Sequence, residues 1–182
     1  MLTIIGDHLD AWLHPSARSD ALASARHRAF IALRLVGSLI AFATFPVYLV
    51  IRGAPGDVEV VAFAWLVTPI LVAYFLSRTG RYEAAQMLSS LSLAMLVAFV
   101  AFNSGGIKSF AMIWLLLVPF EAVLCASRRA VVFAVALVIG VVLALLALHG
   151  LGLIGSWTAA DSTGVMLAGF GVLAAALYAA AI

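Results

Sequence analysis

The sequence predicts an all-α membrane protein, a six-transmembrane up-and-down helical bundle with both termini in the cytoplasm and a short amphipathic N-terminal segment. Of its 182 residues, 66% are hydrophobic and 10% are charged, and the mean hydropathy is +1.21. A soluble domain of this size cannot bury so much apolar surface. Apolar runs of about 20 residues, the length that spans a bilayer as a helix, recur along the chain. Short polar or glycine-rich links separate them.

The predicted spans divide the chain into two regions. Residues 1–28 form a cytoplasmic juxtamembrane segment, and residues 29–182 form the transmembrane domain. The links RGAPGD, SRTGRYE, NSGG and SRR are short, so that successive helices should be antiparallel neighbours. Pro46 and Pro69 predict kinks. The expected spans are residues 29–51, 58–76, 84–102, 107–126, 130–148 and 164–182.

The positions of the positive charges indicate the orientation. Loops rich in Lys and Arg stay in the cytoplasm, and eight of the ten Lys and Arg residues precede or open the first span or follow the second and fourth. Only Arg52 and Lys108 lie on the opposite side.

The N-terminal segment has the spacing of an amphipathic helix on the inner membrane surface, with apolar residues at Leu2, Ile5, Leu9 and Leu13. Pro15 would end this helix, and Ser16 would cap the next one. A frayed terminus is the alternative interpretation.

Several classes of function are disfavoured. The positive charges are scattered and form no patch for nucleic acid. Cys125 is the only cysteine, which excludes an intrachain disulfide and a C-x-x-C pair. No metalloprotease, nucleophile-elbow or phosphate-loop motif is present. The sequence therefore predicts no catalytic residue, no metal site and no cofactor within this chain.

The polar residues around the NSGG link form a candidate ligand site. In the predicted topology Lys108 lies near the outer interface, where it either extends its ammonium to water or faces a ligand. Nearby hydroxyl, amide and aromatic groups would complete a small amphipathic pocket. The candidate ligand-binding residues are Asn103, Ser104, Lys108, Ser109, Phe110 and Trp114.

Glu121 lies inside the fourth predicted span and needs a partner. Arg128 is about two turns away, so that a pair would require both side chains to stretch, and a partner on another helix is an equal alternative. Pro119 allows a kink just before it. Glu121 is interpreted either as a packing or interfacial anchor or as a functional switch or proton site.

Other polar and small residues in the spans are candidates for packing or signal transfer. Ser89 and Ser92 share a face of the third span and suit interhelical hydrogen bonds. Gly140 and Gly171 belong to ladders of small residues in the fifth and sixth spans, which allow close helix approach within the bundle or between protomers. The sequence ends in GVMLAGFGVLAAALYAAAI with no cytoplasmic anchor, and we expect the natural chain to continue.

Three stretches carry a resemblance to a known family. They are HPSARSDALASARHRAFIALRLVGSLIAF, FAWLVTPILVAYFLSRTGRYEAAQMLSSLSL and SGGIKSFAMIWLLLVPFEAVLCASRRAVVFA. They resemble the N-terminal membrane region of alphaproteobacterial sensor histidine kinases of the DivJ type. The Gly-Gly turn, the span with Trp then Pro, and the closing Arg-Arg resemble a broader group of six-span sensor kinases that includes the CqsS type.

The resemblance implies a homodimeric receptor of the bacterial inner membrane. Its helices would relay a signal to a cytoplasmic kinase domain that this chain lacks, and only that domain would use ATP and Mg²⁺ and meet a response regulator. The signal would be a small amphipathic ligand or a membrane partner protein. The alternatives are a passive membrane anchor that localises a signalling enzyme, and a small transporter subunit.

Overall fold

The structure, a computed structural model, describes residues 12–125 and 127–154. Every regular element in this part is a helix. Four helices there are long and apolar enough to cross a membrane, which agrees with an all-helical membrane protein. They are Ala21–Ile51, Asp57–Thr79, Tyr82–Asn103 and Arg128–Gly150. The predicted sixth span, Gly171, and Leu2, Ile5 and Leu9 of the amphipathic segment lie outside the described residues.

The first long helix, α2 (Ala21–Arg52), begins eight residues before the predicted span. Its cap is Asp20, whose carboxylate accepts a hydrogen bond from the Leu22 amide at 2.9 Å. The prediction that Ser16 caps this helix is therefore wrong. Ser16 belongs to the short 3-10 helix η1 (Pro15–Ala17), and its Oγ lies 2.7 Å from Nδ1 of His14.

The second predicted span is divided into α3 (Asp57–Trp65) and α4 (Thr68–Thr79). The break precedes Pro69, which has no N–H to donate to the Trp65 carbonyl four residues back. Pro46 lies inside α2 without ending it. The two prolines thus differ in effect, because α2 continues through Pro46 whereas a new helix begins next to Pro69.

The fourth predicted span is not a continuous α-helix. After α5 (Tyr82–Asn103) come the 3-10 helices η2 (Gly106–Lys108) and η3 (Phe110–Leu116), and then α6 (Leu117–Leu124). Where η3 meets α6, Pro119 lacks the N–H that would bond the Leu115 carbonyl. Because a 3-10 helix rises more per residue than an α-helix, η3 and α6 together extend about 26 Å, close to a bilayer's roughly 30 Å of hydrocarbon.

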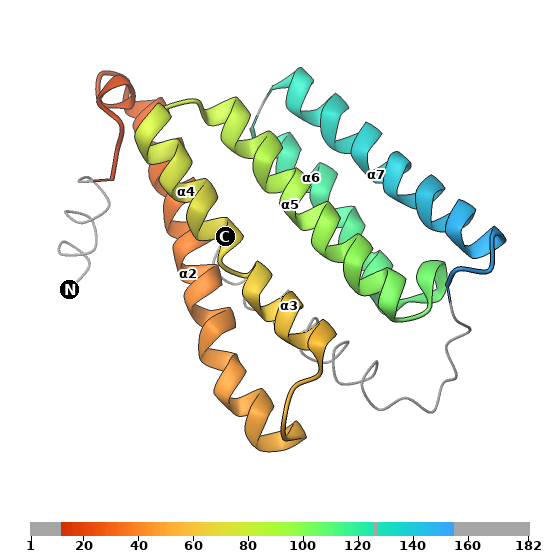
Figure 1. Cartoon of the computed structure of the whole chain (residues 1–182). Coiled ribbons are helices and arrows are strands. Elements are labelled where there is room, and N and C mark those ends of the chain that lie inside the picture. Colours follow the sequence, from red (N-terminus) through yellow and green to blue (C-terminus); the bar gives the residue numbers. More distant parts are fainter. Residues whose placement is uncertain (1–11, 126, 155–182) are drawn as a thin grey trace.

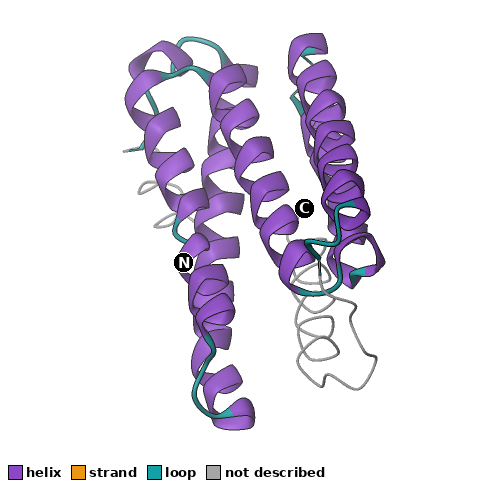
Figure 2. Cartoon of the chain, turned by 45° about the vertical axis from the view of Figure 1, so that its right-hand side comes forward, coloured by secondary structure: helices purple, strands orange, loops and turns teal. Residues whose placement is uncertain are grey.

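The last described helix, α7 (Arg128–Gly150), returns beside α5 and α6. In Figure 1 the chain runs in alternating directions through α2, then α3 and α4 in line, then α5, then α6, and then α7. We call α2, α3 and α4 the first lobe, and α5, η3, α6 and α7 the second lobe. The two lobes meet where α4 and α3 pack against α5, and Figure 2 shows them from another side. The end with the α4–α5 link is the Gly80 end, and the end with the α5–η2 link is the Gly105 end.

The described residues form two hydrophobic cores, and each core belongs mainly to one lobe. The first core lies near the Gly80 end, where Phe30 and Ile31 of α2 meet Val72 and Leu76 of α4 and Ala85 of α5. The second core joins α5, η3, α6 and α7. Its buried members are Ala94, Val97, Ala101, Ala111, Leu115, Val118, Ala122, Ala134, Val141, Leu145 and Ile154. α5 contributes to both cores and is therefore the central helix of the described bundle.

We predict that Gly80→Ala destabilises the protein. Gly80 ends α4 at φ 64°, and an added Cβ would lie 2.7 Å from Nδ1 of His14. Left-handed backbone strain alone costs about 1–2 kcal/mol, so thermal unfolding in detergent should occur at a lower temperature. Gly140→Ala is the matched control, because nothing lies within 4 Å of a Cβ there and alanine favours the helix. Equal stability of the two variants would contradict this account.

Candidate functional site: a buried ion pair and an apolar cavity between the lobes

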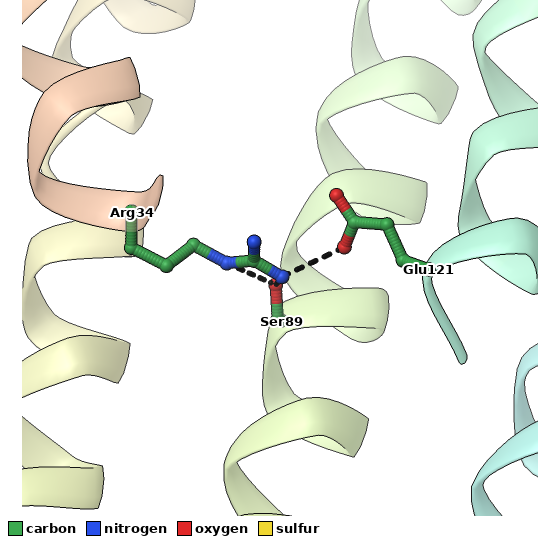
Figure 3. A network of polar contacts seen from close by, with 3 residues as sticks. All are labelled: Arg34, Ser89 and Glu121. Atoms are coloured by element: carbon green, nitrogen blue, oxygen red, sulfur yellow. Dashed lines mark hydrogen bonds and ion pairs between the residues drawn. The ribbon is translucent and has the colours of Figure 1, made fainter. Parts of the chain in front are cut away.

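Three side chains from three helices form a buried polar network (Figure 3). Arg34 of α2 donates from Nε and Nη2 to Oγ of Ser89 on α5, at 3.0 and 2.7 Å. Its Nη2 also donates to Oε2 of Glu121 on α6, at 2.8 Å. The side chains of Arg34 and Glu121 are only 7% and 10% exposed. This is an ion pair enclosed by helices and completed by a serine hydroxyl.

The surroundings of Arg34 explain why a charge is tolerated there. Removing a guanidinium and a carboxylate from water costs several kcal/mol each, and attraction offsets that cost only with good geometry and further hydrogen bonds. Ser89 supplies such bonds. Phe30, one turn earlier in α2, places its ring 4.5 Å from the Arg34 guanidinium carbon, a favourable cation–π contact.

The network connects the two lobes. Arg34 belongs to the first lobe, whereas Ser89 and Glu121 belong to the second. Of the two sequence-based alternatives for Glu121, the structure shows a partner on another helix, and that partner is Arg34 rather than Arg128. α2 packs mainly on α4, and the arginine side chain provides a polar link from α2 to the second lobe.

Beside this network lies a cavity of about 360 Å³ between the lobes. Its walls come from α2, α3, α4, α5, η3 and α6, and most of the side chains are apolar. The polar or charged side chains in its lining are Arg34, Ser38, Thr44, Glu59, Trp65, Ser89, Ser92 and Glu121. An apolar pocket with a few convergent polar groups is the usual form of a small-molecule site.

A second buried carboxylate lies nearer the Gly105 end. The Tyr48 hydroxyl donates to Oε1 of Glu59, and the Gly56 amide donates to Oε2 at 2.7 Å. Tyr48 is 1% exposed and Glu59 is 6% exposed. These contacts join α2 to α3 within the first lobe. They position the link between the two helices rather than connecting the lobes.

The sequence-predicted ligand residues separate into two groups. Phe110 and Trp114 line the cavity. The Oγ atoms of Ser104 and Ser109 lie 2.6 Å apart in a hydrogen bond. Asn103 is exposed and donates to the Phe99 carbonyl of its own helix, and Lys108 is exposed on η2. The structure therefore does not bring Asn103 or Lys108 to the aromatic side chains.

The packing candidates also differ in their surroundings. Ser89 accepts from Arg34, and Ser92 accepts from Nε1 of Trp65 at 3.1 Å. Pro119 lies in the first turn of α6. Gly140 is exposed on α7, with open space around an added Cβ. Among the described residues, no three His, Cys, Asp or Glu side chains are grouped as metal ligands.

Sequence reasoning missed Arg34, Ser38 and Glu59 as site residues. A signal for Arg34 was present: it lies five residues after the start of the predicted span 29–51, and Glu121 lies five residues before the end of the span 107–126. In an up-and-down bundle these two ends meet at the same membrane surface. Opposite charges at equal depth would therefore have indicated the pair.

Comparison of the chain with protein-family models, with curated proteins and with solved structures found no match.

We predict that Glu121→Gln and Arg34→Gln each destabilise the bundle. Each change removes one charge from a buried pair, which typically costs about 3–5 kcal/mol. The double variant Arg34→Met/Glu121→Met should recover most of the loss, because no buried charge remains without its counterpart. Equilibrium unfolding of the original protein and the three variants in detergent micelles measures the loss of stability and its recovery. Single variants within about 0.5 kcal/mol of the original protein, the usual range for surface changes, would contradict a structural role.

Proposed function

We propose that the chain is the transmembrane signal-sensing and dimerisation region of a two-component sensor histidine kinase. The observation that carries this proposal is the Arg34–Ser89–Glu121 network, which connects two lobes beside an apolar cavity. The resemblance of three long stretches to the membrane region of DivJ-type sensor kinases supports the same function. The proposed location is the bacterial inner membrane, with six spans and both termini in the cytoplasm.

The network would suit a receptor, because its contacts would form or break in discrete steps. A buried charge pair with directed hydrogen bonds has a formed and a broken arrangement and few intermediate ones. A bundle with two such packings can be biased by any ligand that prefers one of them. A ligand that occupies the adjoining cavity would change the distance between the lobes, which the Arg34 side chain bridges.

The positive charges support the proposed orientation. Arg78 and Arg81 flank the α4–α5 link, and Arg128 and Arg129 begin α7, all at the Gly80 end. Lys108 lies at the Gly105 end. Under the positive-inside rule the Gly80 end faces the cytoplasm. Arg34 and Glu121 then lie in the cytoplasmic half of the bundle.

In this proposal the signal leaves through the predicted last span, residues 164–182, towards a cytoplasmic phosphotransfer helix and an ATP-binding domain. ATP, Mg²⁺ and the cognate response regulator belong to that output part. A homodimer would let the last spans of two protomers shift against each other. A passive anchor would share the fold, but its output would not respond to changes in the Arg34 network.

A small transporter subunit is the second candidate, and the same network favours it. Ionisable side chains at membrane depth often mark substrate or ion pathways, and Arg34 and Glu121 line the cavity. Flux measurements in proteoliposomes separate the two functions. If the protein transports a solute and Glu121→Gln abolishes that transport, the transporter function would replace the sensor proposal.

The orientation can be tested by cysteine labelling. In a Cys125→Ala background, Lys108→Cys should react with a membrane-impermeant maleimide added to intact spheroplasts. Arg81→Cys should react only after the membrane is permeabilised, because the positive-inside rule places it in the cytoplasm. The reverse pattern would contradict the proposed topology.

The sensor function can be tested on the natural protein expressed from its whole coding region and reconstituted in vesicles. Arg34→Gln and Glu121→Gln should change the ratio of autophosphorylation to phosphatase activity by about fivefold or more, the effect of a coupling near 1 kcal/mol. Glu83→Gln is the matched control, since Glu83 accepts from Ser127 within the second lobe. A protein without kinase activity, or one whose activity ignores both variants, would overturn the proposal.

A further inference from the structure

We propose that the cavity between the lobes binds one single-chain amphiphile that carries a neutral hydroxyl or carbonyl oxygen, and that this oxygen hydrogen-bonds Ser38. The inference rests on the proposed function only where it identifies this molecule as the signal that the protein senses. Binding itself can be measured without any output domain, so the two proposals can fail separately.

The dimensions of the cavity suit a chain. Its volume of about 360 Å³ is at the lower end of the roughly 300–1,000 Å³ of small-molecule pockets. On α2 its lining runs from Leu33 and Arg34 to Thr44, and the ten residues from Arg34 to Thr44 rise about 15 Å along the helix. A space that is long, small in volume and mostly apolar matches a flexible hydrocarbon chain.

Ser38 identifies the polar part of the ligand. The residue is 3% exposed and lines the cavity, yet in the described part of the chain its Oγ has no hydrogen-bond partner. Leaving a buried hydroxyl unsatisfied costs about 1–3 kcal/mol. Ser90 is also buried without a partner, but it does not line the cavity. Among the described residues, Ser38 is thus the buried hydroxyl without a hydrogen-bond partner that a ligand in the cavity can reach.

The other polar side chains in the lining already make hydrogen bonds. Thr44 donates to the Ala41 carbonyl, Trp65 donates to Ser92, and Glu59 accepts from Tyr48 and Gly56. Arg34 and Glu121 compensate each other's charge. A neutral head group therefore fits better than an ionised one. An ordered water is a poor substitute at Ser38, because buried waters typically make about three hydrogen bonds.

The cavity can be entered from the side. Val36 belongs to its lining and is 45% exposed, so the cavity opens at the surface of α2. Gly37 follows it, and a Cβ added there would have nothing within 4 Å. A bilayer amphiphile could slide its chain between the lobes past this glycine, with its oxygen stopping at Ser38 next to Arg34.

The test uses a photoreactive analogue of 1-decanol with a diazirine in its chain and the purified 182-residue protein in nanodiscs. Labelling should map by mass spectrometry to the cavity-lining parts of α2 and α5, and unlabelled 1-decanol should compete better than decane. In Ser38→Ala the preference for the alcohol over the alkane should fall about fivefold, the worth of one neutral hydrogen bond. A preference that is unchanged would overturn the assignment of Ser38.

Gly37→Leu should fill the cavity and reduce labelling by at least about tenfold, while helix content and size-exclusion profile stay unchanged. Gly140→Leu is the matched control, because it makes the same change at an open position of α7. If Gly37→Leu does not fold, the competition between 1-decanol and decane in Ser38→Ala still tests the proposal. Equal labelling of both leucine variants would overturn the proposal. The proposal would also be overturned if Gly37→Cys formed a disulfide with a cysteine introduced within residues 164–182. That segment would then occupy the cavity.

Discussion

The described bundle depends on one interaction, the ion pair between Arg34 and Glu121 with Ser89 between their helices. Charges at this depth persist only when partners compensate the loss of water. The three positions must therefore remain in register, and that requirement couples α2, α5 and α6. The coupling matters because α2 takes part only in the first core and α6 only in the second, so that neither core of the described residues contains both helices.

The cavity follows from the same constraint. Arg34 reaches the second lobe with an extended side chain (Figure 3), and beyond it towards the Gly105 end the lobes are lined by apolar groups that enclose about 360 Å³. A ligand that fills a cavity beside a directed polar contact can act on that contact. Under either proposed function, this is the part of the described bundle where binding energy can alter helix packing.

Much of the fold could be predicted from apolar run lengths and link chemistry, since each predicted span among the described residues contains helix. The details that failed depend on local bonding: Asp20 displaces Ser16 as the cap, and the 3-10 helices η2 and η3 form the first half of the fourth span. Glu121 was recognised because a carboxylate within a span needs a partner. Arg34 was counted only as an orientation charge, and Ser38 could not be found, because an unsatisfied hydroxyl is a property of packing.

The most direct test of the central claim is the distance between the lobes with and without the ion pair. Nitroxide labels at Leu39 of α2 and Leu143 of α7, both exposed, can be measured by pulsed electron resonance in nanodiscs, in a Cys125→Ala background diluted with unlabelled protein. A single narrow distance distribution that broadens or shifts in Arg34→Gln and in Glu121→Gln is the predicted result. Identical distributions in all three proteins would show that other contacts hold the lobes without the ion pair, and would contradict the account.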